Sequence, residues 1–251
     1  MSPSPLSSSF ATLPDVPNAQ ARHASMLRAR LLNEADADDI AMLRDEVLGG
    51  LSHPDCYIRE DDEAAFLRAH RAPCGETVGM FDGKRLVAYA MIGLPAHDDP
   101  ANLAHALGLP LPLRGALAHL ASCMVHPDWR GLGLQRTLLG TRLALARSHG
   151  RHLCAAVVSL HNHTSRHNML RRGLHLAALA QIDGVQRQIA LIDLDHGLHV
   201  DTGDERLIDS NDAAAQRSAF AEGYVALGEV REAARVRLRF LRRLDVQFSP
   251  L

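Results

Sequence analysis

The sequence predicts an α/β fold, in which one sheet of about seven strands carries helices on its faces. One observation behind this prediction is that short apolar runs, typical of strands, alternate with segments whose apolar residues recur at helical spacing. Another is a pair of hairpin signals, in which two apolar runs flank an Asp-Gly dipeptide at 82–83 and at 183–184. The chain of 251 residues is long enough for one sizeable domain with an extension.

The N-terminal half of the predicted sheet contains a strand, two helices and a hairpin. Residues 27–33 alternate loosely and predict the first strand. The next segment predicts a helix with Asp36 as its N-cap, apolar residues at helical spacing and a Gly-Gly stop. Residues 59–70 predict a second, short helix, and residues 76–95 predict the first hairpin.

The C-terminal half of the predicted sheet alternates strands with helices. Residues 95–116 are rich in Pro, Ala and Leu without a clear period, so they are predicted to be an inserted loop. The elements that follow are a strand at 117–125, a helix from Leu134 to near Gly150, a strand at 152–160, a helix at 162–172 and a hairpin at 174–194.

Both ends of the chain are predicted to lie outside this sheet. Residues 1–22 are rich in Ser and Pro and predict a disordered tail, and residues 23–195 form the predicted domain. Residues 196–251 are predicted to be a helical extension that begins with a helix capped by Asn211. Residues 229–244 fit a helical spacing but also alternate apolar residues with Arg, and the helical interpretation is favoured.

Composition limits the class of protein. The net charge of -2 provides no global field for nucleic acid or an anionic membrane, so neither is expected as a partner. No apolar run approaches the length of a membrane span, and the N-terminus does not read as a secretory signal. The four cysteines form no Cys-x-x-Cys pair, which favours a reduced protein located in the cytoplasm.

The glycine-bearing loop before the helix at Leu134 is the first candidate site. The first turn of a helix exposes unpaired N–H groups and a partial positive charge, and phosphates bind there readily. Gly131 and Gly133 would let the backbone approach a pyrophosphate closely, with the amides of residues 132–136 as donors. Taken alone the signal is weak, because a flexible turn before a helix has the same composition.

Two segments in order carry a more specific pattern. In the first, residues 125–135, a strand ends in Val-His-Pro and is followed by Arg-Gly-Leu-Gly-Leu-Gln. In the second, Asn162 is followed by Ser165 three positions later and by Gly173 eleven positions later. With these motifs in this order and separation, the chain resembles the GNAT superfamily of acyl-CoA-dependent N-acyltransferases over roughly residues 27–195.

The resemblance implies a mostly antiparallel sheet whose strands at 117–125 and 152–159 splay apart to admit the pantetheine arm of acetyl-CoA. The backbone of Cys123 and Val125 would pair with that arm, and the Cys123 N–H would face the thioester oxygen, as an oxyanion requires. The cofactor-binding residues that the resemblance implies are Cys123, Met124, Val125, Arg130, Gly131, Leu132, Gly133, Leu134, Gln135, Arg136, Asn162, Ser165 and Asn168. Gln135 and Leu174 depart from the signature, which has a small and an aromatic residue there.

The function implied is an N-acetyltransferase that transfers an acetyl group from acetyl-CoA to a primary amine by direct attack in a ternary complex. The amine could belong to a small molecule or to a protein, and the sequence does not identify it. Two alternatives stay open: a catalytically weak acyl-CoA-binding or regulatory module, and an acyltransferase for longer acyl chains. A homodimer is also left open.

The groups that move protons depart from the family pattern. Many GNAT enzymes use a Tyr where this chain has Met169, so Ser165, His167 and Asn168 become the candidates for the general acid. His119 is the candidate base, four residues before Cys123, and strand alternation would place both on one face with Ser122 on the other. His119 could equally be a structural strand residue with its ring hydrogen-bonded. Cys123 could be a covalent nucleophile, but a small side chain is enough at that position, which favours a role for its backbone alone.

A metal site is not expected. His163 and His167 lie one helical turn apart and invite a metal interpretation, but the acyl-CoA motif accounts for this segment. No carboxylate or Cys completes a ligand set there, so acetyl-CoA is the only cofactor predicted.

Overall fold

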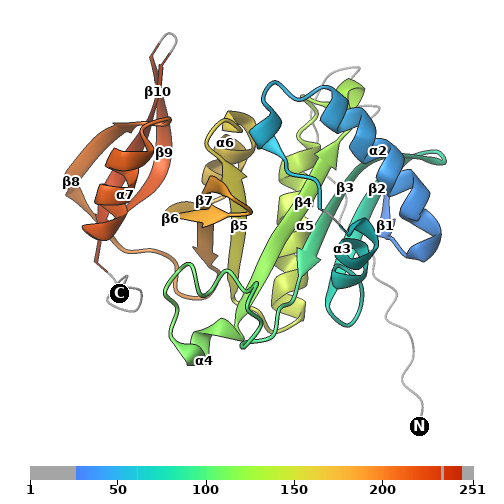
Figure 1. Ribbon diagram of the computed structural model, residues 1–251, viewed down its shortest axis with the longest axis horizontal. Coiled ribbons are helices and arrows are strands. Elements are labelled where there is room, and N and C mark those ends of the chain that lie inside the picture. Colours follow the sequence, from blue (N-terminus) through green and yellow to red (C-terminus); the bar gives the residue numbers. More distant parts are fainter. Residues whose placement is uncertain (1–26, 61, 233–234, 245–251) are drawn as a thin grey trace.

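The computed structural model describes residues 27–60, 62–232 and 235–244, which form one sheet with helices on both faces (Figure 1). The predicted tail at 1–22 lies outside the described residues. The strands are β1 (Arg28–Leu31), β2 (Gly75–Asp82), β3 (Arg85–Gly93), β4 (Leu117–Val125), β5 (Leu153–Ser159), β6 (His175–Ile182), β7 (Val185–Asp193), β8 (Val200–Asp209), β9 (Tyr224–Glu232) and β10 (Arg235–Arg243). The helices are η1 (Glu34–Asp36), α2 (Ala37–Gly49), η2 (Pro54–Cys56), α3 (Glu63–Ala69), α4 (Leu111–Arg114), η3 (Pro127–Trp129), α5 (Leu134–Ser148), α6 (His163–Arg171) and α7 (Ala213–Ala221).

The strand order in the sheet is β1-β2-β3-β4-β5-β7-β6-β9-β10-β8, and every described pairing except β4–β5 is antiparallel. The two predicted hairpins are confirmed as β2–β3 and β6–β7. The α/β class is therefore confirmed, but the sheet has ten strands rather than about seven. The extra strands all come from the C-terminal segment.

The middle of the sheet is covered on both faces. Along β3, residues 87–92 are completely buried, as expected for a continuous apolar run between two layers of helix. One layer is α5, α6 and α7, whose apolar residues share one core cluster. On the other face, α2 and α3 pack on the first strands, and the inserted segment 95–116 packs on β5, β6 and β7. That segment is an ordered cover that includes the short helix α4.

The splay predicted between β4 and β5 is confirmed. The two strands pair in parallel over three positions, from Leu117 opposite Leu153 to His119 opposite Ala155. Beyond them, β4 continues to pair with β3, and β5 continues to pair with β7. Backbone groups on the facing edges of β4 and β5 are therefore turned towards the opening between the strands.

A β-bulge in β4 corrects the predicted side-chain alternation. The register against β3 shifts between the pair Ile92–Leu120 and the pair Ala90–Cys123, so an extra residue is inserted. As a result Cys123 packs on the α5 side of the sheet. Ser122 instead lies on the α2 side, where its hydroxyl is 3.4 Å from that of Tyr89. The prediction that His119 and Cys123 share a face, with Ser122 on the other, is wrong because it assumed an unbroken strand.

The C-terminal segment corrects the predicted helical extension. The helix near Asn211 is confirmed as α7, although Asp212 caps it, but the Arg-rich stretch forms strands β9 and β10. Along β10, Leu238 and Phe240 are fully buried, while the alternating Arg237 and Arg239 pair with Glu232 of β9 and Glu205 of β8. Alternation, rather than helical spacing, was the informative pattern in this segment.

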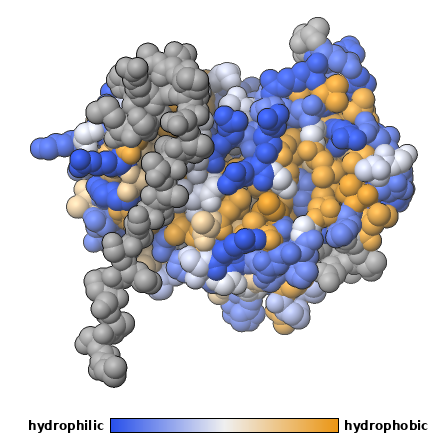
Figure 2. Space-filling model, turned by 180° about the vertical axis from the view of Figure 1, so that it is seen from behind, coloured by the Kyte–Doolittle hydropathy of each residue, from blue (hydrophilic) through white to orange (hydrophobic). Residues whose placement is uncertain are grey.

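The face opposite to the view of Figure 1 carries hydrophobic side chains at its centre and at its right-hand side, separated by hydrophilic ones (Figure 2). The right-hand area covers the end of the molecule where Figure 1 places β8, β9 and β10. No helix in the described ranges is long and apolar enough to cross a membrane.

Candidate active site

A cavity of about 620 Å³ lies where β4 and β5 part. Its walls come from the end of α2 and η2, the end of β4, the glycine loop with the start of α5, and the start of α6. Of the residues predicted to bind the cofactor, all but Leu132 line it: Cys123, Met124, Val125, Arg130, Gly131, Gly133, Leu134, Gln135, Arg136, Asn162, Ser165 and Asn168. The two sequence motifs are therefore brought together around one space.

The glycine loop has a backbone that favours glycine at two positions. Gly131 and Gly133 have φ of 81° and 77°, in the left-handed region that other residues rarely adopt. Gly133 is the N-cap of α5 and supplies no side chain to the first helical turn. A Cβ added there would lie 3.4 Å from Nη2 of Arg136. The loop thus leaves the helix N-terminus accessible from the cavity and places a guanidinium beside it.

The edge of β4 presents the donors that the resemblance implied. The N–H of His126 donates to the carbonyl of Val87 on β3, at 2.9 Å. Because N–H groups alternate in direction along a strand, those of Val125 and Cys123 point the opposite way, into the opening towards β5. An extended ligand that enters the cavity can pair with them like an added strand.

Gln135 connects the two helices that flank the cavity. Its side chain donates to Oγ of Ser165 at 3.2 Å and accepts from Nδ2 of Asn168 at 2.6 Å. The departure from the family signature is therefore accommodated by a polar bridge to α6. Asn162 caps α6 by accepting from the N–H of Ser165 at 3.1 Å, which fixes the second motif as a helix N-terminus.

The sequence analysis missed a tyrosine that lines the cavity and a glutamate that contacts it. Tyr57 lines the cavity, and its hydroxyl is 3.0 Å and 3.1 Å from the two carboxylate oxygens of Glu60. Burial, followed by the charge of Glu60, raises the pKa of Tyr57, so its hydroxyl stays protonated and donates. Ser122 lies against it. The sequence offered no stronger signal for this pair than a tyrosine three residues before a glutamate.

Comparison with known proteins decides the family. Residues 41–174 match the profile of the acetyltransferase (GNAT) family, which covers more than half of the chain. The chain belongs to the GNAT acetyltransferase family. No curated protein matches this GNAT chain significantly.

Solved structures share the fold of this GNAT protein. The yncA structure from Salmonella typhimurium, which contains its cofactor acetyl-CoA, has a TM-score of 0.53 and 19% identity over 70% of this chain and 98% of that one. An acetyltransferase from Acinetobacter baylyi has a TM-score of 0.52 and 19% identity, over 67% and 92% of the two chains. The ribosomal-protein-S18-alanine N-acetyltransferase of Escherichia coli has a TM-score of 0.50 and 14% identity, over 67% and 94%.

Of the predicted catalytic residues of this GNAT chain, two lie outside the cavity lining and the others line it. His119 is absent from the cavity lining; its Nε2 accepts the N–H of Leu103 at 3.0 Å, and burial lowers its pKa to about 4. His167 contacts Glu229 outside the cavity, through Nδ1 and Oε2 at 3.2 Å. Cys123 and Ser165 do line the cavity, and burial raises the pKa of the Cys123 thiol.

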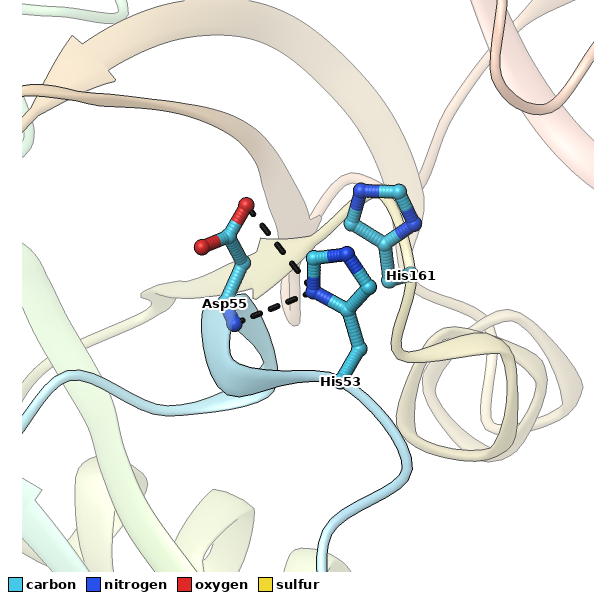
Figure 3. Close-up of side chains that lie close together, drawn as sticks. All are labelled: His53, Asp55 and His161. Carbon is cyan, nitrogen blue, oxygen red and sulfur yellow. Dashed lines mark hydrogen bonds and ion pairs between the residues drawn. The ribbon is translucent and has the colours of Figure 1, made fainter.

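One group of side chains has the composition of a metal site. His53, Asp55 and His161 lie beside the cavity with potential ligand atoms within 4.8 Å of one another (Figure 3). However, Nδ1 of His53 accepts the N–H of Asp55 at 3.1 Å, so the proton of the neutral ring lies on Nε2. A metal on Nδ1 would take the lone pair that accepts this hydrogen bond. A metal on Nε2 would move the ring proton to Nδ1, which could then no longer accept. The two imidazoles instead stack, with ring centroids 3.7 Å apart.

Proposed function

We propose that this GNAT protein is an N-acetyltransferase that transfers the acetyl group of acetyl-CoA directly to a primary amine in a ternary complex. The observation that supports this most is that one cavity is lined by Gly133 at the N-terminus of α5, by Cys123 on β4 and by Tyr57 after η2. A cofactor and an acceptor can therefore meet within the same space.

In this proposal acetyl-CoA is the cosubstrate. Its phosphates bind the amides at the start of α5, with Arg130 and Arg136 as nearby cations. Its pantetheine arm pairs with the free N–H groups of β4, and the Cys123 N–H donates to the thioester oxygen as negative charge develops there. The presence of acetyl-CoA in the yncA structure, which has the same fold, supports this assignment.

Tyr57 and Glu60 supply the route for the amine proton. As the ammonium of the acceptor gives its proton to the Tyr57 oxygen, the Tyr57 hydroxyl proton passes to the Glu60 carboxylate. The free amine then attacks the thioester carbon and the C–N bond forms. The C–S bond breaks, and the second proton of the nitrogen passes to the departing sulfur, so the amide and the CoA thiol are released. The carboxylic proton of Glu60 finally leaves to water and restores the starting state.

His119 is a weaker candidate for this role, because it lies outside the cavity lining and its lone pair already accepts the Leu103 N–H. Cys123 acts through its backbone in this scheme. A buried thiol with a raised pKa is a poor nucleophile, which favours direct attack over an acetyl-cysteine intermediate.

The acceptor enters on the side formed by the end of α2 and η2. That wall combines apolar side chains, Leu48 and Leu51, with the polar tip of Tyr57, so it suits an amine carried on an apolar stem. Both a small-molecule amine and a peptide amine fit this description. The cytoplasmic location and the absence of nucleic-acid, membrane and metal partners stay predictions.

A second candidate function rests on Met169, which is buried where many relatives have the catalytic tyrosine. It favours a weak acyl-CoA-binding module, or a transferase for longer chains. The test measures CoA thiol release from acetyl-CoA and from longer acyl-CoA esters across a panel of amines. Turnover that is fastest with acetyl-CoA supports the proposal. Tight binding of acyl-CoA without turnover on any amine would establish the acyl-CoA-binding module. Faster turnover with a longer ester would establish the transferase for longer acyl chains.

A further inference from the structure

The C-terminal segment repeats the β5–β7 part of the GNAT sheet at a constant offset of 50 residues. The bounds of α7 are those of α6 shifted by 50, and the bounds of β10 are those of β7 shifted by 50. Each helix is followed by a glycine with positive φ, 92° at Gly173 and 84° at Gly223. Both units therefore have the order strand, helix, strand, strand.

The strand register repeats as well. Leu176 pairs with Ala190 in the first unit, and Ala226 pairs with Phe240 in the second. At the next position of each hairpin the register shifts, so the irregularity is repeated too. A shared bulge at the same offset is not required by the hairpin itself, and it indicates a common origin for the two units.

The helix caps repeat in detail. Asn162 accepts the N–H of Ser165 at 3.1 Å, and Asp212 accepts the N–H of Ala215 at 2.9 Å. The second unit thus keeps the local structure of the acyl-CoA motif. It replaces the neutral cap by a carboxylate, and its first strand, β8, ends the sheet with no counterpart of β4 or the glycine loop beside it among the described strands.

The two units face each other across a pseudo-two-fold axis. Leu176 on β6 pairs antiparallel with Ala226 on β9, and these two residues are equivalent positions of the repeat. The strand order on the two sides, β5-β7-β6 and β9-β10-β8, is palindromic, as Figure 1 shows at the C-terminal end of the sheet. In addition α7 packs on β6 and α6 packs on β9. This is the geometry of an isologous dimer, built within one chain.

We propose that residues 200–243 are a duplicated half-domain that no longer binds acyl-CoA and instead holds α6, and with it the acyl-CoA cavity, in position. The inference rests on the proposed function, because it assumes that the cavity binds acyl-CoA. It assigns a role to the whole C-terminal extension, whose second unit occupies the β6 edge where a second subunit could otherwise add.

Glu229 on β9 makes the contact that carries this role. Its carboxylate, only 2% exposed, accepts from Nε of Arg166 at 2.9 Å and contacts Nδ1 of His167 at 3.2 Å. Arg166, fully buried, also donates to the carbonyl of Leu160 at 2.9 Å. Leu160 lies in the turn that presents Asn162 to the cavity. A change at Glu229 is therefore transmitted to the cavity wall through two hydrogen bonds.

The repeat itself shows that this contact is specific to one unit. The equivalent of Glu229 in the first unit is Leu179, and the equivalent of Arg166 in the second is Gln216. Gln216 accepts from Gln188 at 2.7 Å and has no carboxylate among its described partners. Glu229 and Arg166 are thus each found in one unit only, and they meet beside the acyl-CoA motif.

The experiment uses the full chain and measures acetyl-CoA affinity by calorimetry, with the melting temperature of each variant. Glu229→Gln removes the buried charge. The matched control is Glu232→Gln on the same strand, because Glu232 is exposed and pairs with Arg237. Glu229→Gln should weaken acetyl-CoA binding about tenfold or more, since a misplacement of the order of 1 Å can cost up to about 10²-fold. Glu232→Gln should leave the affinity unchanged.

A double variant separates positioning from stability. Arg166→Gln with Glu229→Leu installs the residues that the sister unit uses, and replacing a buried ion pair by a neutral pair usually preserves folding. The double variant should keep a melting temperature near that of the wild type but lose acetyl-CoA affinity to a similar extent. A folded single or double variant with wild-type affinity would overturn the proposal.

Two further outcomes are informative: variants that do not fold, and a wild-type chain that does not bind acetyl-CoA. If both variants fail to fold, hydrogen exchange of the wild-type chain with and without acetyl-CoA replaces them: the ligand must protect β9 around Glu229 as well as α6, and protection confined to residues 117–171 overturns the proposal. If the wild-type chain itself does not bind acetyl-CoA, the proposed function has failed, which is distinct from wild-type binding that ignores Glu229.

Discussion

The Tyr57 hydroxyl, in the lining of the cavity, lies 3.0 Å from Oε1 and 3.1 Å from Oε2 of Glu60. This pair is the only tyrosine–carboxylate contact that reaches the cavity lining within the described residues. If it accepts the amine proton, Tyr57→Phe and Glu60→Gln should each lower kcat/KM at neutral pH by about 10²–10⁴-fold, the usual contribution of a positioned base. Acetyl-CoA affinity should not change.

The pH–rate profile identifies the reason for that loss. The deficit of both variants should shrink as pH rises, because more of the acceptor amine is then already deprotonated. Tyr89→Phe is the matched control, since it removes a hydroxyl that also neighbours Ser122 but does not line the cavity. Equal losses for Tyr57→Phe and Tyr89→Phe would assign the effect to packing and exclude the relay.

The glycine loop predicts a severe and separable effect on the cofactor. Gly133→Asp adds a Cβ at φ of 77° and a negative charge where the pyrophosphate is expected, so CoA affinity should fall at least about tenfold. Gly184→Asp, at φ of 76° in the β6–β7 turn, adds the same backbone strain of about 1–2 kcal/mol without touching the cavity. Arg130→Ala should weaken binding less than Gly133→Asp, since the amides do most of the holding.

Calorimetry with CoA on folded proteins measures all three variants of that series. The expected order of affinity is wild type and Gly184→Asp together, then Arg130→Ala, then Gly133→Asp. Unchanged affinity in Gly133→Asp would remove the glycine loop from the cofactor site.

Much of this arrangement could be predicted from the sequence, because it depends on local signals. The two Asp-Gly hairpins, the N-terminus of α5 and the cap at Asn162 are each specified by a few adjacent residues. The same applies to the cofactor-binding residues, which come from two short motifs and converge once β4 and β5 splay.

The features that were missed depend on partners distant in the chain. The bulge in β4 is held by Arg142 on α5, whose Nη1 donates to the carbonyl of Ala121 at 3.0 Å, and no pattern within 117–125 announces it. The helical prediction for β9 and β10 failed because their apolar residues fit both periods, and pairing with β8 decides between them. The repeat was invisible because few residues besides Gly173 and Gly223 are identical between the units.

The thiol of Cys123 should be dispensable. Burial raises its pKa, and the scheme uses only its backbone N–H, so Cys123→Ala should keep kcat/KM within roughly threefold of the wild type, at a stability cost of about 1 kcal/mol. Acid quenching during turnover, followed by mass spectrometry, should show no acetylated enzyme. A loss above about 10²-fold together with an acetylated Cys123 peptide would instead establish a covalent intermediate.

His119 should control acid stability rather than turnover. Burial lowers its pKa from the usual 6.5 to about 4, so the unfolded chain takes up this proton at a higher pH than the folded chain does. The stability contributed by neutral His119 is therefore complete above about pH 6.5 and is lost as pH falls towards 4, by up to roughly 3 kcal/mol. In His119→Gln an amide oxygen can still accept the Leu103 N–H, and the unfolding free energy should fall less steeply over this window. Burial also lowers the pKa of His70, so part of the pH dependence of the unfolding free energy should remain in His119→Gln.

Chemical denaturation between pH 4 and 7, with kcat/KM measured at pH 7.5, tests the predicted effects of His119 on stability and on turnover. A variant that unfolds with the wild-type pH dependence but loses 10²-fold or more in turnover would restore His119 as the base and displace Tyr57 from that role.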